Sequence, residues 1–177
     1  MHISLLVSVI ADDRPGLVDS LSAVVNDFGG NWLESNMSRL SGKFAGIVRV
    51  SVTADDVQKL ESALLEHATK ESGLKLQIER IDAGDVDEET AADQSKALAI
   101  ELVANDRAGI VSEISRTLAQ LSINVESFSS FCEPAPMSSG QLFRARIEMR
   151  MPSSVKRGDL RARLELLADD LMLELLD

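Results

Sequence analysis

The chain contains one pattern twice, 93 residues apart. The segment Ala11–Val18 (ADDRPGLV) returns as Ala104–Val111 (ANDRAGIV), and the match runs without a gap over residues 5–37 and 98–130. Eight of these 33 pairs are identical, and five of the eight lie within the Ala11–Val18 segment. Internal repetition of this kind predicts two copies of one small fold. Because the identities gather in a connecting segment, we expect that segment to have a function.

Each copy predicts the same order of secondary structure. Apolar and polar residues alternate over 3–10 and 98–103, which is typical of strands, and apolar residues then recur at helical spacing from Leu17 and from Ile110. A second strand is expected at 31–39 in the first copy and 124–132 in the second, and a closing strand at 74–81 and 171–176. The third strand between them should bury Val48, Val50 and Val52 in the first copy and Ile147, Met149 and Met151 in the second. The second helix should carry Val57, Leu60, Leu64 and Ala68 in the first copy and Leu160, Leu164 and Ala168 in the second.

This βαββαβ order predicts an α+β protein with two ferredoxin-like domains, each an antiparallel four-stranded sheet with two helices on one face. Residues 82–95 contain Asp and Glu but no Lys or Arg, a composition that cannot bury a core. We therefore expect domain 1 at residues 1–82, an acidic linker at 83–95 and domain 2 at 96–177.

Domains of about 80 residues have thin cores, so we expect the two halves to pack together or to form a homodimer. The aromatic residues of the second strands either join the cores or face such a contact: Trp32, Phe128 and Phe131.

Composition excludes several classes of function. The formal charge of −11, from 29 acidic and 18 basic residues, would repel a phosphate backbone, so direct nucleic-acid binding is not expected. The single cysteine, Cys132, cannot form an internal disulfide, and the first residues enter a strand without a charged or long apolar leader. No apolar run suggests a membrane span. We therefore expect a soluble, cytoplasmic protein.

The repeated segment joins a strand to a helix, where unpaired backbone N–H groups can hold a carboxylate. Gly16 and Gly109 have no Cβ, so a ligand can approach the main chain closely. Asp13 and Asp106 either cap the helix or accept a hydrogen bond from a ligand's ammonium group. An α-amino acid carries both charges and fits this chemistry. The alternative is purely structural, with Asp as a cap, Pro15 as a helix start and glycine as a packing requirement.

Two asparagines at the starts of the second strands, Asn31 and Asn124, coincide in the repeat and are expected within reach of the turns, where an amide can donate and accept. The candidate ligand-binding residues are therefore Asp12, Asp13, Arg14, Pro15, Gly16, Leu17 and Asn31 in the first copy, and Asn105, Asp106, Arg107, Gly109, Ile110 and Asn124 in the second.

No catalytic residues, metal site or cofactor are expected besides an amino-acid effector. Cys132 could pair with His2 or His67 as nucleophile and base, but the sequence places no supporting acid near them. The acidic pairs lack the spacing of a calcium loop and are expected to cap helices or to face solvent: Asp12-Asp13, Asp55-Asp56 and Asp169-Asp170.

The Asp-Arg-Pro-Gly-Leu-Val turn and the Gly29-Gly30-Asn31 opening of the second strand resemble the ACT domain, a small amino-acid-sensing regulatory module. In that family the glycine-bearing turn and the following asparagine line the effector site, usually at an interface between two such domains. The second copy departs from the pattern, with Ala108 in place of proline and Ser122-Ile123 in place of the double glycine. We therefore expect the second site to be altered in affinity or to serve only for packing.

Two copies filling the chain, with an irregular loop at 133–137, are similar to the family of glycine cleavage system transcriptional repressors. This resemblance implies glycine as the effector and a DNA-binding transcriptional activator as the protein partner. One alternative is a stand-alone regulatory subunit of an amino-acid-pathway enzyme. A third interpretation is an enzyme similar to formyltetrahydrofolate deformylase, which pairs an ACT domain with a catalytic domain. This sequence offers no such catalytic domain.

Overall fold

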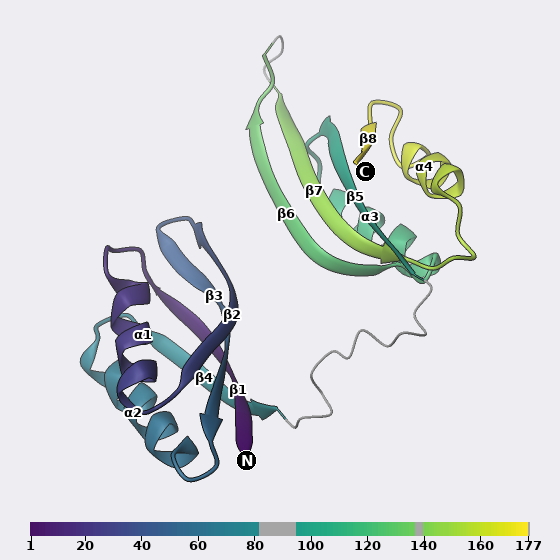
Figure 1. Cartoon of the computed structure of the whole chain (residues 1–177). Helices are drawn as coiled ribbons and strands as arrows, with labels where there is room; N and C mark the ends of the chain where they lie inside the picture. Colours follow the sequence, from purple (N-terminus) through teal and green to yellow (C-terminus); the bar gives the residue numbers. More distant parts are fainter. Residues whose placement is uncertain (82–94, 137–139, 177) are drawn as a thin grey trace. The chain divides into compact units, whose positions relative to one another are not determined.

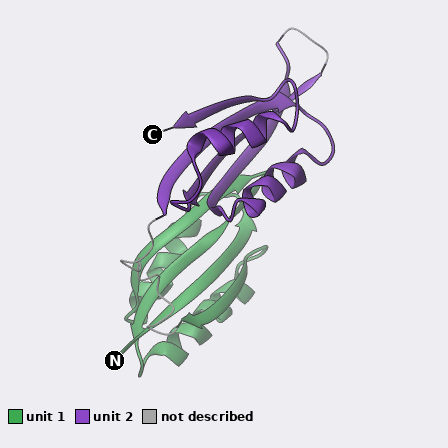
Figure 2. Ribbon diagram, turned by 90° about the vertical axis from the view of Figure 1, so that its right-hand side faces the viewer, with its two compact units in different colours: residues 1–90 green, residues 91–177 purple. Residues whose placement is uncertain are grey.

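The alternating apolar residues at the start of each copy form a central strand of a sheet. In a computed structural model, which describes residues 1–81, 95–136 and 140–176, the chain divides into unit 1 (residues 1–90) and unit 2 (residues 91–177) (Figures 1 and 2). The elements of unit 1 are β1 (His2–Asp12), α1 (Leu17–Asp27), β2 (Asn31–Leu40), β3 (Lys43–Thr53), α2 (Val57–Lys70) and β4 (Lys75–Ile81). Those of unit 2 are β5 (Lys96–Asn105), α3 (Ile110–Gln120), β6 (Asn124–Pro134), β7 (Gln141–Met151), α4 (Arg157–Glu165) and β8 (Met172–Leu176).

Both units have the predicted topology. The strand orders are β2-β3-β1-β4 and β6-β7-β5-β8, and every neighbouring pair is antiparallel. In each unit both helices lie on one face of the sheet (Figure 1). The predicted class, two ferredoxin-like βαββαβ domains, is confirmed. The acidic linker expected at 83–95 lies, apart from Ser95, outside the described residues.

The cores form on the helix side of each sheet, where the period-two pattern placed them. In unit 1, Val50, Val52 and Leu60 have no exposed surface, and in unit 2 Ile147 and Leu164 have none. Met149 and Met151 are buried, as predicted. The prediction for Ala168 is wrong, because α4 ends at Glu165 and Ala168 packs on the core from the segment that follows.

The aromatic residues of the second strands do not share one role. Trp32 packs against the core of unit 1 and Phe128 against that of unit 2. Each is paired across the sheet with a residue that faces the helices, so its own side chain lies on that face too. The alternative that they face a contact between domains is therefore wrong for these two. Phe131 lies on the other face of the sheet and is 57% exposed.

The first helices of both units end in the same hydrogen-bonded turn. The amide of Gly29 donates to the Asn26 carbonyl (3.0 Å) and that of Gly30 to the Val25 carbonyl (2.8 Å), which is the Schellman pattern. In unit 2, Ser122 and Ile123 make the matching bonds to Ala119 (2.9 Å) and Leu118 (3.0 Å). The backbone geometry of the repeat is therefore retained where its glycines are lost.

Ser122 adopts this turn at φ 54°, a left-handed conformation that carries a steric cost for a residue with a Cβ. Ser122→Gly is expected to stabilise unit 2 by about 0.5–1 kcal/mol, because the relief of strain exceeds the added entropy of the unfolded chain. Gly29→Ser, at φ 71° in unit 1, is the reverse exchange and should destabilise by a similar amount. Urea unfolding of both variants measures this, and an unchanged stability at Ser122 would contradict it.

None of the helices within the described residues is long and apolar enough to cross a membrane.

Candidate functional site

The first turn presents free backbone donors beside a glycine. Gly16 precedes α1 at φ 87°, and a Cβ built on it would meet no atom within 4 Å. The first helical hydrogen bond runs from the Ser20 amide to the Gly16 carbonyl (2.9 Å). Within the described residues, the amides of Leu17 and Val18 have no hydrogen-bond acceptor. The positive end of α1 therefore offers two donors next to open space, an arrangement that suits a carboxylate.

Ion pairs fasten this turn to the rest of unit 1. Asp12 pairs with Lys43, and a hydrogen bond from that ammonium group lowers the pKa of the Asp12 carboxyl. Asp13 pairs with Arg39 at 2.7 Å. Arg14 pairs with Glu71, which follows α2. The turn is thus held from two sides, by the β2–β3 hairpin and by the end of α2.

These contacts limit what the aspartates can do. The cap position of α1 is Gly16 and that of α3 is Gly109, and neither helix has a side-chain cap. The alternative that Asp13 and Asp106 cap the helices is therefore wrong. An ammonium group could reach Asp13 only in competition with Arg39.

The second turn has the same backbone but fewer free donors. Gly109 adopts φ 91°, and the Ile110 amide is already bonded to the Arg107 carbonyl (3.3 Å), unlike the amide of Leu17. The Arg107 guanidinium donates to both oxygens of Glu113 (2.9 and 2.5 Å) and to the Leu167 carbonyl (3.1 Å). The backbone amide of Asn105 also donates to the Asp170 carboxylate (2.7 Å). This turn is tied down by its own side chains.

Two other predicted site residues, Leu17 and Ile110, are buried beneath the turns. The side chains of Leu17 and Ile110 are each only 4% exposed and belong to the two cores. They fix the position of the helix ends and do not face a ligand. Pro15 is exposed directly before Gly16.

The structure does not bring Asn31 to the turn of its own unit. Asn31 pairs with Ser51, which pairs with Ser4 near the start of β1, whereas the turn follows Asp12 at the end of β1. Asp12 lies eight residue steps beyond Ser4 along the strand, a length of about 26 Å. Asn124 likewise pairs with Arg150 at the far end of its sheet. The expectation that each asparagine reaches its own turn is wrong, so a site that uses both needs two domains.

The Asn31 side chain is exposed and has no hydrogen-bond partner among the residues that the structure describes. Asn31→Ala is therefore expected to leave the stability of the ligand-free protein unchanged, within about 0.5 kcal/mol. If the amide contacts a bound amino acid, the same change weakens binding by about 1–3 kcal/mol. Urea unfolding and calorimetry on this variant separate the two effects. A loss of stability alone would remove Asn31 from the site.

The thiol of Cys132, the alternative nucleophile, is not activated. Cys132 is exposed on unit 2, and its pKa is raised by desolvation of the thiol and by the nearby Asp106 carboxylate, which disfavours the thiolate. Both histidines lie in unit 1, where His67 contacts Ser20 (3.4 Å). Across the described ranges, no cluster of three or more His, Cys, Asp and Glu side chains has the arrangement of a metal site.

Comparison with known proteins agrees with this architecture. Residues 4–79, which carry the turn and the whole of the first repeat, match the family model of the ACT domain. Unit 1 therefore carries an ACT domain. A solved structure of an unknown protein from Galdieria sulphuraria has 26% identity to this chain and a TM-score of 0.81, with 100% of each chain covered. No curated protein sequence matches the chain.

A second solved structure, provisionally named as a glycine cleavage system transcriptional repressor, has 19% identity and a TM-score of 0.71 and covers 100% of this chain and 99% of its own. At this identity the likeness establishes a shared fold over the full length. The folds of the two units are therefore found together, in the same order, in other solved structures.

Sequence reasoning missed the partners that hold the first turn, which are Arg39, Lys43 and Glu71. Each lies more than 20 residues from the turn along the chain. The one available signal was charge: an Asp-Asp-Arg segment facing a hairpin with two basic residues.

Proposed function

We propose that this chain is a non-catalytic regulatory protein that binds a small amino acid and controls a protein partner by contact. The free amides of Leu17 and Val18 beside Gly16, in a unit that matches the ACT family, are the observation that carries this proposal. The ligand carboxylate would accept from these amides at the N-terminus of α1. Its ammonium group would meet the side-chain oxygen of an asparagine from a second domain, since Asn31 lies at the other end of its own sheet.

Glycine is the effector that we favour. Its support is the full-length likeness to a structure named for the glycine cleavage system, together with the sequence pattern. The partner on this proposal is a DNA-binding transcriptional activator, and the acidic charge of −11 is compatible with a protein that acts on such a partner without touching DNA. The second candidate is a regulatory subunit of an amino-acid-pathway enzyme, which would use the same turn.

A thermal-shift screen of all proteinogenic amino acids tests the proposal. A ligand at about 100 times its Kd should add about 2.7 kcal/mol of stability. Glycine, or another small amino acid, is expected to raise the Tm, while the corresponding amine and carboxylic acid alone are not. No response to any amino acid would contradict sensing. Co-purification of an enzyme in place of a transcription factor would favour the second candidate.

A further inference from the structure

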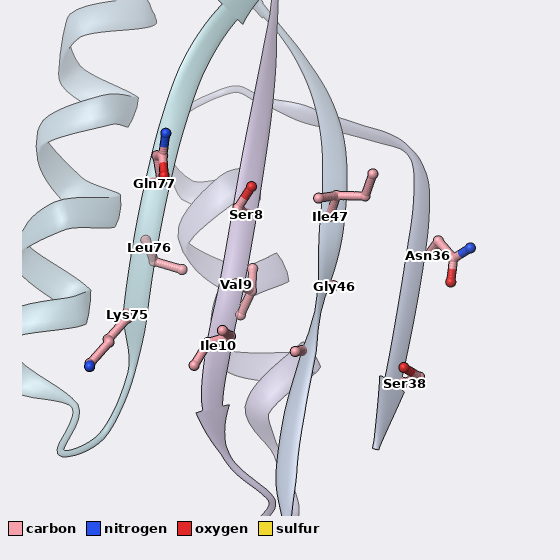
Figure 3. A pocket seen from close by; sticks show the side chains of 11 residues that line it. Ser8, Val9, Ile10, Asn36, Ser38, Gly46, Ile47, Lys75, Leu76 and Gln77 are labelled. Atoms are coloured by element: carbon pink, nitrogen blue, oxygen red, sulfur yellow. The ribbon is translucent and has the colours of Figure 1, made fainter. Parts of the chain in front are cut away.

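The face of the unit 1 sheet that the helices leave bare has an apolar centre. Residues paired across neighbouring strands point to the same face, and on this face Ile10 and Ile47 are 50% and 47% exposed. They border a shallow hollow of about 590 Å³ whose lining also includes Ser8 and Ala45 (Figure 3). Figure 3 shows the four strands side by side, with Gln77 and Lys75 on β4 at one edge. An apolar centre within a polar rim is the usual anatomy of a protein contact.

The matching face of unit 2 is built differently. Its register places Arg144 where unit 1 has Ala45, and Arg146 where unit 1 has Ile47. Arg146 pairs with Glu101 (3.2 Å) and Glu148 (3.4 Å), and all three side chains are about half exposed to solvent. Covering those ion pairs would cost desolvation energy. Of the two bare faces, that of unit 1 is the one suited to burial.

The charges on the unit 1 face favour a second copy of the same chain. The face has no net charge, although the whole protein carries −11. Its three acidic side chains are Asp12, Glu34 and Glu79, and its three basic side chains are Lys43, Arg49 and Lys75. Two such faces can approach without the repulsion that the rest of the surface imposes. An acidic or basic partner would find no complementary field here.

The order of side chains on this face is also self-complementary. One row across the sheet consists of Gln77, Ser8, Ile47 and Asn36. A two-fold axis along this row would place Ile47 against its own copy. It would also place Ile10 opposite Leu6 and Lys75 opposite Glu79, because each pair lies two residues to either side of the row.

The rim charges fit this arrangement. Within the described residues, Lys75 has no ion-pair partner and the Glu79 carboxylate accepts only from the side-chain amide of Gln77 (2.9 Å). We propose that the bare sheet face of unit 1 is a symmetric dimer interface with a second copy of this chain. With one full spacing for each of the four strands (about 4.8 Å) and each of the five rows (about 6.8 Å), each face measures roughly 19 by 34 Å. The two copies together would bury about 1,300 Å², which lies at the lower end of the range for a specific interface.

Sedimentation of the full chain over a range of concentrations tests the proposal, with a dimer expected for the wild type. Ile47→Lys sets two ammonium groups against each other at the axis and should weaken the dimer by at least about 30-fold. The side chain is half exposed, so the fold should remain intact by circular dichroism. The matched control is Arg146→Lys, which places lysine at the same register in unit 2 and should leave the dimer unchanged.

A charge exchange tests the symmetry itself. In Lys75→Glu the new carboxylate would face Glu79 of the other copy, and in Glu79→Lys the new ammonium group would face Lys75. Each single variant therefore sets like charges against each other and should weaken the dimer. The double variant sets opposite charges against each other again and should restore it. A wild-type monomer at all concentrations, a dimer that survives Ile47→Lys, or a double variant no better than its parents would each overturn the proposal. A dimer broken by Ile47→Lys and by Arg146→Lys alike would also overturn it, since the face of unit 2 would then be involved.

Discussion

Gly16→Val is expected to weaken amino-acid binding by about 100-fold. Valine disfavours φ 87° strongly, so the turn would relax toward negative φ and turn the amides of Leu17 and Val18 away from the ligand. Each hydrogen bond to a carboxylate contributes about 1.5–3 kcal/mol, and the loss of one to two of them corresponds to this factor. Isothermal calorimetry with glycine, or with whichever amino acid the screen identifies, gives the change in Kd.

Gly109→Val provides the matched control in unit 2. Its φ of 91° makes the backbone strain similar, so both variants should lose comparable stability, about 1–2 kcal/mol. Binding should fall much less, because the Ile110 amide is already used by Arg107 and the turn offers fewer donors. Equal losses of affinity in the two variants would show that both turns bind and would contradict the asymmetry.

Gly46→Ala is expected to destabilise unit 1 by about 3 kcal/mol, the largest effect of any single methyl group that we foresee. A Cβ at Gly46 would lie 2.2 Å from the Asn36 carbonyl oxygen and 2.6 Å from the Met37 Cα, both backbone atoms of the neighbouring β2. Backbone atoms cannot move aside as side chains do, so β2 must separate from β3 at this point. Urea unfolding measures the loss.

Gly158→Ala is the control for this prediction. Gly158 lies in α4, and an added Cβ would meet nothing within 4 Å. Alanine there should stabilise the protein by about 0.5–1 kcal/mol through helix propensity and reduced entropy of the unfolded chain. A Gly46→Ala variant as stable as the wild type would mean that β2 and β3 lie farther apart than the structure places them.

The fold could be predicted from the sequence because it depends on short periods. The alternation in β1 and the helical spacing in α1 can each be recognised from residues a few positions apart. The repeat then shows the same pattern a second time for each element. The ends of elements were less certain. Ala168 continued an apolar spacing that the α4 helix itself does not follow beyond Glu165.

The candidate site was harder to predict because it depends on register and on distant partners. Asn31 follows α1 directly, which suggested that it lies near the turn where α1 begins. A helix of 11 residues, however, carries the chain back along the sheet, so its two ends lie at opposite ends of β1. The pairing of Asp12 with Lys43 spans 31 residues and could not be read from local spacing.

The separation of Asn31 from its own turn has a thermodynamic consequence. A free amino acid is far shorter than about 26 Å of strand, so it cannot touch both features of one unit. If it binds to both features, it joins two domains, and ligand binding and domain pairing become linked equilibria. By reciprocity, whatever free energy the ligand adds to the pairing, the pairing adds to the affinity for the ligand. The concentration of amino acid that such a sensor reports would then depend on how readily its domains associate.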